Sequence, residues 1–214
     1  MSEIKKTKIS ANIAKKLLEI EAVKLRPENP FTWASGIISP IYCDNRKTLS
    51  YPEIRTEIAK AFAEVANSEK PFDLIAGVAT GGIAHGALVA DKMNLPFIYV
   101  RSSKKKHGTG QQVEGQFHEG QSCVVIEDLI STGKSSLEAV DALREVGLHV
   151  KKVISIFTYE FEEAKEAFFS KDCDYESLST YSALLEEANQ LGYIKEKDLE
   201  SLNKWSENPR EWKR

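Results

Sequence analysis

The chain has 214 residues, a formal net charge of −3, and a composition (42% hydrophobic, 29% charged) that is typical of a globular protein. This length fits one α/β domain with appendages, or at most two small domains. The small negative charge argues against a dedicated nucleic-acid binder, and no apolar run approaches the ~20 residues that cross a membrane. The N-terminus lacks the apolar core of a secretory signal. The three cysteines form no CxxC pair, so they indicate neither a disulfide framework nor a zinc site, and we expect a cytoplasmic protein.

The N-terminal third of the chain predicts two helices with an irregular segment between them. Apolar residues at helical spacing indicate a helix over residues 9–24 and another over residues 51–67. Residues 31–45 carry a glycine, a proline and several aromatic or β-branched side chains, which favour a short hairpin or flap. We expect residues 1–50 to form an N-terminal hood on a single domain that spans residues 1–214.

From residue 72 onward the pattern alternates between strands and helices. The expected strands are residues 72–78, 97–100, 122–126 and 149–158, and the expected helices are residues 82–93, 135–146 and 161–170. This alternation predicts an α/β fold with a central, mostly parallel sheet and helices on both faces. Beyond Asp174 the chain is polar and is expected to be helical.

The most informative stretch is residues 123–136, CVVIEDLISTGKSS. An apolar strand ends in two acids, Glu127 and Asp128, and a loop rich in Gly, Ser and Thr (residues 131–135) precedes an amphipathic helix. Such a loop at a helix N-terminus offers backbone N–H groups to an anion. The two acids suit sugar hydroxyls or a bound metal. Together they predict a site for a phosphorylated ribose at the carboxyl edge of the sheet.

Two other interpretations of this stretch stay open. Gly133, Lys134 and Ser135 look like the end of a P-loop, but the P-loop spacing requires a glycine where the chain has Asp128. The stretch could also be an ordinary buried strand followed by a capped helix with no ligand.

Two further segments carry candidate chemistry. Residues 79–82, Ala-Thr-Gly-Gly, follow a predicted strand and open a helix, so they form a second candidate anion site. Residues 101–116 lack apolar periodicity and combine several basic residues with glycines, which is typical of a mobile loop. Beside a phosphate site, we expect this basic loop to act as a lid that closes over a polyanion.

Residues 123–136 resemble the motif with which type I phosphoribosyltransferases bind 5-phosphoribosyl 1-diphosphate (PRPP). The resemblance implies a set of PRPP-binding residues from this motif, from residues 79–82 (the glycine loop) and from the basic loop: Thr80, Gly81, Arg101, Lys105, His107, Glu127, Asp128, Leu129, Ile130, Ser131, Thr132, Gly133, Lys134 and Ser135. Arg101, Lys105 and His107 are also the implied catalytic residues, since they would clamp the departing pyrophosphate.

The basic loop and the flap resemble those of the orotate phosphoribosyltransferases. The loop reads R-x-x-x-K-x-H-G from Arg101, and the flap reads S-G-x-x-S-P-x-Y from Ser35. The resemblance implies that Ser131 and Lys24 bind orotate. The chain departs from the family pattern in the basic loop (Ser102), in the glycine loop and after the strand that ends near Thr158.

This resemblance also implies an activity, a cofactor and partners. The expected reaction transfers the phosphoribosyl group of PRPP to orotate, giving orotidine 5′-phosphate and pyrophosphate in de novo pyrimidine (UMP) biosynthesis. Mg²⁺ is the implied cofactor, and no protein metal ligand is identified with certainty. A homodimer that shares its lid between subunits is also implied. The alternatives are a purine-base phosphoribosyltransferase and a non-catalytic PRPP-binding regulator.

Overall fold

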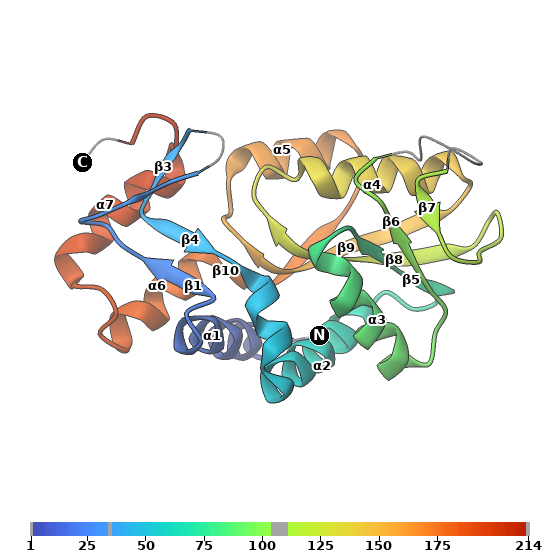
Figure 1. Ribbon diagram of the computed structural model, residues 1–214, viewed down its shortest axis with the longest axis horizontal. Coiled ribbons are helices and arrows are strands. Elements are labelled where there is room, and N and C mark those ends of the chain that lie inside the picture. The colour runs from blue at the N-terminus through green and yellow to red at the C-terminus, as the bar shows by residue number, and fades with distance from the viewer. Residues whose placement is uncertain (1, 34–35, 104–110, 213–214) are drawn as a thin grey trace.

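The computed structural model describes residues 2–33, 36–103 and 111–212 (Figure 1). Its centre is a sheet of six strands in the order β10-β9-β8-β5-β6-β7. The first five are parallel to one another, and β7 is antiparallel to β6. The strands are β5 (Leu74–Val78), β6 (Phe97–Val100), β7 (Val113–Glu114), β8 (Ser122–Ile130), β9 (His149–Thr158) and β10 (Tyr175–Thr180). The predicted α/β fold with a mostly parallel central sheet is therefore confirmed.

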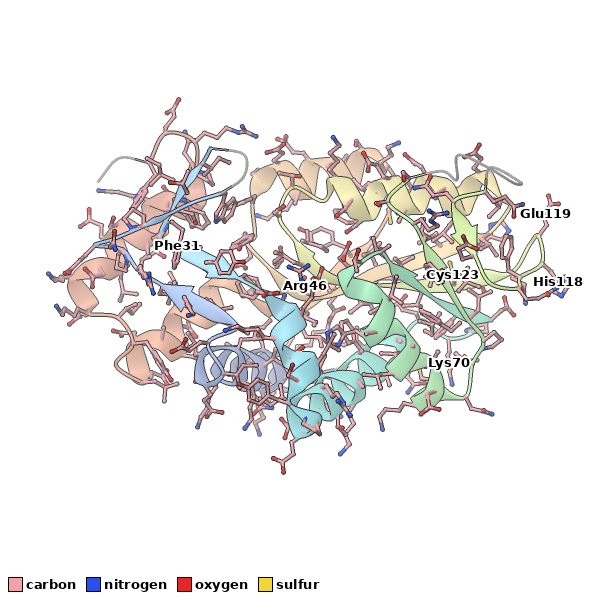
Figure 2. The ribbon with its side chains drawn as sticks, in the orientation of Figure 1. Phe31, Arg46, Lys70, His118, Glu119 and Cys123 are labelled. Carbon is pink, nitrogen blue, oxygen red and sulfur yellow. The ribbon has the colours of Figure 1, made fainter. Side chains whose placement is uncertain are left out.

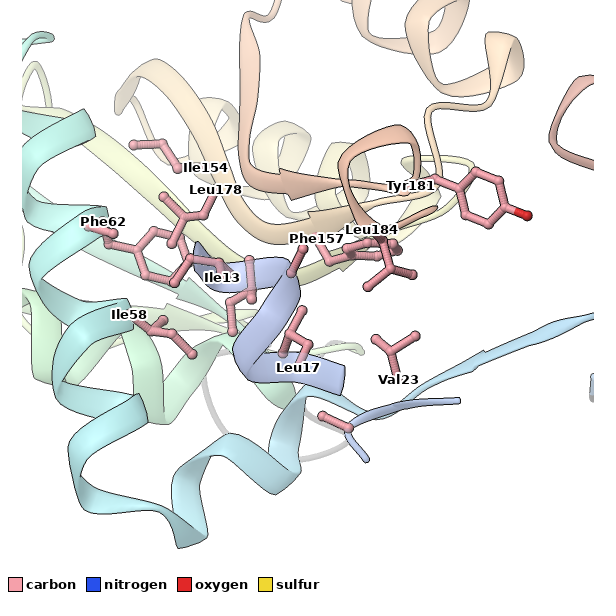
Figure 3. Close-up of a cluster of buried hydrophobic side chains, with 14 of the residues drawn as sticks. Ile13, Leu17, Val23, Ile58, Phe62, Ile154, Phe157, Leu178, Tyr181 and Leu184 are labelled. Atoms are coloured by element: carbon pink, nitrogen blue, oxygen red, sulfur yellow. The ribbon is translucent and has the colours of Figure 1, made fainter. Parts of the chain in front are cut away.

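Helices cover both faces of the sheet, as predicted (Figure 1). One face carries α1 (Glu3–Glu19), α2 (Pro52–Asn67) and α3 (Gly81–Met93), and the other carries α4 (Lys134–Glu145) and α5 (Glu162–Ser170). Each face buries its own apolar cluster. Figure 3 shows part of the larger cluster, where Ile13 and Leu17 of α1 lie near Ile58 and Phe62 of α2. Among the described residues, no helix is long and apolar enough to cross a membrane.

A small hood stands beside the sheet. It consists of β1 (Val23–Leu25) paired with β4 (Ile41–Cys43), and a hairpin of β2 (Phe31–Thr32) and β3 (Ile38–Ser39). A short 3-10 helix, η1 (Asn45–Ser50), leads from β4 to α2. The hairpin is the predicted flap. Because α1 packs against β10 and α6 (Tyr181–Gln190), it belongs to the body of the domain. The assignment of residues 1–50 to one hood stays a prediction.

Several predicted elements differ from the structure. The strand predicted over residues 122–126 runs on to Ile130 as β8. The first helix ends at Glu19, and Lys24 lies on β1 instead. The basic loop contains β7, which extends the sheet at one edge. The segment after Asp174 begins with a strand, β10, because residues YESLST pair in parallel with β9. Helices α6 and α7 (Glu196–Glu207) follow it, so the helical prediction holds only from Tyr181 onward.

The C-terminal helix α7 fixes the hood to the body of the domain. Trp205 is completely buried, and its ring contacts Trp33 of the flap at 5.7 Å and Phe161 at 5.5 Å between ring centroids. Its indole Nε1 donates a hydrogen bond to the carbonyl oxygen of Ile38 at 3.1 Å. One side chain therefore supplies both apolar contact and a polar link between the two ends of the chain.

We expect Trp205→Ala to lower the free energy of unfolding by about 3–5 kcal/mol, because it removes a large buried ring and its hydrogen bond to the flap. Chemical denaturation measures this change. Phe169→Ala is a matched control: Phe169 is also aromatic but is 90% exposed, so its loss should change stability by less than about 0.5 kcal/mol. Equal losses in the two variants would contradict the role given to Trp205.

Candidate active site

The candidate site lies where β8 continues beyond its neighbour β5. The register of these two strands ends at the pair Gly77–Ile126, whereas β8 runs on to Ile130 alongside β9. Parallel strands leave their ligand sites at this carboxyl edge. The two acids predicted at the strand end, Glu127 and Asp128, are thus the first residues of β8 beyond its pairing with β5.

Glu127 is turned into the protein. Only 3% of it is exposed, Oε1 accepts a hydrogen bond from the backbone N–H of Asp128 at 2.9 Å, and Oε2 accepts one from the Ser136 hydroxyl at 3.2 Å. The Ser135 hydroxyl is a more distant donor to Oε2 at 3.5 Å. Burial, followed by the neighbouring charge of Asp128, holds the pKa of Glu127 well above its ordinary value. Glu127 therefore ties the end of β8 to the first turn of α4.

Asp128 lies against the glycine loop. A Cβ atom built on Gly81 would collide with the Asp128 carboxylate, so these two residues are in direct contact. Asp128 is only partly buried. Of the two predicted acids, Asp128 is therefore the one whose carboxylate can meet a ligand in the site.

The loop between β8 and α4 fits an anion. Gly133 adopts φ +79°, a left-handed conformation that favours glycine, and α4 begins at Lys134. The first intrahelical bond runs from the Leu137 N–H to the Gly133 carbonyl, which leaves the preceding N–H groups outside the helix ladder. A Cβ at Gly133 would meet the ring of Phe168, so the loop is packed against α5 on its inner side.

The glycine loop opens a second helix beside this one. Thr80 is the N-cap residue of α3, Gly81 is its first residue, and the Ala79–Thr80 peptide bond is cis. A Cβ at Gly82 would collide with the carbonyl oxygen of Ile126, so the first turn of α3 is in direct contact with the backbone of β8. The two candidate anion loops, residues 131–135 and residues 79–82, thus lie at the same edge of the sheet, after two adjacent strands.

The basic loop is described only at its base. Arg101 follows β6, and its guanidinium lies 3.6 Å from the Glu114 carboxylate. Its backbone N–H donates to the Gln112 carbonyl at 2.9 Å, and the Gln112 side-chain amide donates back to the Arg101 carbonyl at 2.6 Å. Lys105 and His107, the other two predicted catalytic residues, lie outside the described residues.

Other predicted site residues are placed less centrally. Lys24 lies opposite Tyr42 on the β1–β4 pair, and its ammonium forms an ion pair with Glu21 at 2.8 Å. The side chains of Leu129 and Ile130 pack into the two apolar clusters, one on each face of the sheet. Any contact of these two residues with PRPP would therefore involve their backbone.

A cavity of about 410 Å³ joins the phosphate loop to the flap. Trp33 and Ile37 line it from the flap, Ser131 and Thr132 from the loop, and Phe161 from the start of α5. The C-terminal segment closes the remaining side with residues 206–210. The cavity thus brings Ser131, for which orotate binding stays a prediction, next to the flap.

The sequence patterns predicted no role for two residues of this region, Asn45 and Arg46. Asn45 is buried, and its side-chain amide donates to the Asp128 carbonyl oxygen at 2.6 Å. Arg46 lies on η1 (Figure 2) and forms an ion pair with Asp44 at 3.1 Å. Asp44 raises the pKa of Arg46, with a smaller contribution from Asp128. Neither residue belongs to a recognisable motif, because each meets Asp128 only through the fold.

Comparison with known proteins identifies the class. The family described as "Phosphoribosyl transferase domain" matches residues 47–184, which include both anion loops and the basic loop. An orotate phosphoribosyltransferase of Lactococcus lactis subsp. cremoris is 53% identical over 205 residues, covering 95% of this chain and 98% of that protein. One from Bacillus subtilis is 53% identical over 198 residues, covering 92% of each chain.

A solved structure agrees with these relatives. The orotate phosphoribosyltransferase from Aeropyrum pernix has a TM-score of 0.75 at 31% identity, over 86% of this chain and 99% of that one. The mostly parallel sheet and its helices thus have the fold of a type I phosphoribosyltransferase. Within that class, the chain belongs to the orotate phosphoribosyltransferase family.

The buried Glu127 predicts a pH dependence of stability. The unfolded chain loses this proton near the ordinary pKa of 4.5, whereas the folded-state pKa lies well above that value. Between the two, the folded protein binds the extra proton, so this group lowers stability as the pH rises through the window. We expect Glu127→Gln to raise Tm near neutral pH, because the amide oxygen can accept from the Asp128 N–H while the amide nitrogen donates to the Ser136 hydroxyl oxygen. The gain should shrink toward pH 4.5.

Thermal denaturation across this pH range measures the effect. Glu166→Gln, a change of an exposed acid on α5, is the control for the loss of one carboxyl group. A constant or negative difference between Glu127→Gln and the wild type would show that the fold does not raise the pKa of Glu127.

Proposed function

We propose that the chain uses this site to transfer the 5-phosphoribosyl group of PRPP to orotate, giving orotidine 5′-phosphate and pyrophosphate. One observation carries the proposal: the partly exposed Asp128 carboxylate lies between the N-termini of α3 and α4, the helices that follow the adjacent strands β5 and β8. A helix N-terminus suits a phosphate and a carboxylate suits sugar hydroxyls, so the arrangement matches the three parts of PRPP. The identity of about half of all residues with curated orotate phosphoribosyltransferases supports orotate as the acceptor.

Different residues would bind the three parts of PRPP. The backbone of residues 131–135 would hold the 5′-phosphate, and Thr80 and Gly81 would hold the pyrophosphate. Asp128 would hold the ribose hydroxyls between them, while Glu127 keeps the end of β8 in place. Positive charge develops at the anomeric carbon when pyrophosphate departs, so fixed dipoles and exclusion of water are the expected contributions of this protein.

Mg²⁺ fits this arrangement through few protein ligands. The described residues contain no group of three or more His, Cys, Asp or Glu side chains that could hold a metal. Mg²⁺ commonly uses one or two carboxylates together with substrate phosphates and water, which the Asp128 carboxylate allows. Bound there, the ion would supply charge neutralisation for the pyrophosphate. The cytoplasmic location expected from the cysteines stays a prediction.

Arg101, Lys105 and His107 would clamp the departing pyrophosphate, and a lysine or histidine could donate a proton to it. The family resemblance further favours a homodimer in which this loop serves the partner subunit. Arg101 and Gln112 are joined by hydrogen bonds, so the two ends of the loop lie together. Half of the ten residues between them can span about 16 Å at ~3.3 Å per residue, so the backbone of the loop can reach a partner's site only within about that distance of Arg101.

The proposal is tested by following orotate consumption with PRPP, with and without Mg²⁺. We expect Asp128→Asn to fold normally and to lower kcat/KM for PRPP by an amount equivalent to about 1.5–3 kcal/mol, because a charged acceptor for the ribose is lost. Adenine, guanine and hypoxanthine in place of orotate test the purine alternative. Absence of any turnover in the wild-type chain would favour a PRPP-binding regulator, and a wild-type kcat/KM in Asp128→Asn would remove the role of this residue.

Complementation tests the shared loop. Lys105→Ala and Asp128→Asn chains, each nearly inactive, are unfolded, mixed and refolded together, and each is also refolded alone as a control. If the loop serves the partner subunit, a mixed dimer has one site with an intact Asp128 and an intact loop, so activity returns. If the loop serves its own subunit, every site keeps a defect. Mixed dimers without recovered activity would exclude sharing and leave the PRPP site untouched.

A further inference from the structure

Asp128 has no partner residue on β5, and side chains form the hydrogen bonds that β5 would otherwise supply to its backbone. Beyond Ile126, β8 is no longer in register with β5. The Asp128 N–H donates to Glu127 Oε1 at 2.9 Å, and its carbonyl oxygen accepts from Asn45 Nδ2 at 2.6 Å. Both backbone groups of this residue therefore have partners that lie outside the sheet ladder.

Asn45 is itself held by two buried polar residues. The Thr48 hydroxyl donates to the Asn45 carbonyl oxygen at 2.6 Å, and His85 Nε2 lies 3.3 Å from the same hydroxyl oxygen. A hydroxyl has one proton, so His85 must donate from Nε2 and carry its ring proton there. His85 Nδ1 is then an acceptor, and it is buried with no hydrogen-bond partner among the described residues.

The resulting chain of hydrogen bonds is fully inside the protein. Thr48 and His85 are completely buried, and Asn45 is 2% exposed. Burial lowers the pKa of His85 to about 4, so the ring stays neutral around neutral pH. The Thr48 hydroxyl holds the Asn45 backbone, and the Asn45 side-chain amide holds Asp128. Loss of one member would leave buried polar groups unpaired, which is costly in a low-dielectric interior.

The three residues connect the parts of the protein that meet PRPP. His85 lies on α3, one turn after the glycine loop that begins this helix. Thr48 and Asn45 lie on η1 at the base of the hood. The last bond of the chain ends on Asp128, whose carboxylate packs against Gly81 at the start of the same α3. The path thus runs from α3 through the hood to β8 and closes on α3 again.

We propose that Asn45, Thr48 and His85 form a positioning network that holds the Asp128 carboxylate at the distance from the glycine loop that PRPP requires. The network acts on the backbone of Asp128 and does not touch the substrate. This inference rests on the role proposed for Asp128, so the test includes that residue separately.

Thr48→Val is the decisive variant, because it keeps the shape of the side chain and removes the hydroxyl at the centre of the network. We expect the KM for PRPP to rise about tenfold, the equivalent of one or two unpaired buried groups, while the KM for orotate stays within about twofold. Thr48→Ser keeps the hydroxyl and should restore the KM for PRPP. Thr56→Val removes a hydroxyl bonded to the Pro52 carbonyl on the exposed side of α2 and should leave both KM values unchanged.

The pattern of constants separates positioning from simple destabilisation. Partial unfolding lowers the concentration of active enzyme and therefore the apparent kcat, with both KM values unchanged. Tm is measured for every variant. If Thr48→Val does not fold, Asn45→Ala, which removes the donor to Asp128, gives the same test.

Three outcomes would overturn the network. The first is a KM for PRPP in Thr48→Val that stays at the wild-type value although Asp128→Asn is impaired. The second is an equal loss in Thr48→Val and Thr48→Ser, which would indicate packing alone. The third is a wild-type kcat/KM for PRPP in Asp128→Asn, which would remove the role of Asp128 and the network with it. A selective rise in the KM for PRPP that Thr48→Ser reverses would establish the network.

Discussion

The site exists because two neighbouring strands differ in length. Strand β5 ends at Val78 and turns into the glycine loop, whereas β8 continues to Ile130. The space beside the last residues of β8 is therefore open to a ligand, and their backbone groups need partners other than a strand. Asn45 provides one partner, and the tight start of α3 against Ile126 fixes the distance between the two loops. An extra pairing of β5 with β8 would close the site.

This arrangement carries a cost in stability. Glu127 is buried next to Asp128, where like charges and the loss of water disfavour its ionised form. The hydrogen bond from the Ser136 hydroxyl at the beginning of α4 offsets part of the cost of burying the Glu127 carboxyl group. An apolar residue there would be easier to bury, but it could not bond the Asp128 N–H and α4 at once. Functional sites commonly break the rules that govern the rest of a fold, and Glu127 is such a position.

The sequence predicted the parts of the fold that depend on local pattern. The alternation of apolar strands with amphipathic helices identified the parallel sheet, and the loop of residues 131–135 was recognisable from its own composition. Strand β10 was not predicted, because the polar sequence YESLST does not indicate a buried strand. Its pairing with β9 in the fold makes it one. Asn45 was missed for a similar reason: its partner Asp128 is 83 residues away. No local pattern marks a residue whose role is set by such a distant contact.

The two substrates of the proposed reaction differ in how the chain builds their sites. The PRPP side comes from continuous motifs, because phosphates are bound by backbone groups of short loops at helix starts. The cavity beside it combines the flap, the phosphate loop, the start of α5 and residues 206–210, which are far apart in the chain. Its charged lining residues are Glu162, Glu163, Glu207 and Arg210. These residues reach the cavity from the start of α5 and from the segment at and after the end of α7, so no local pattern in the sequence marks this lining.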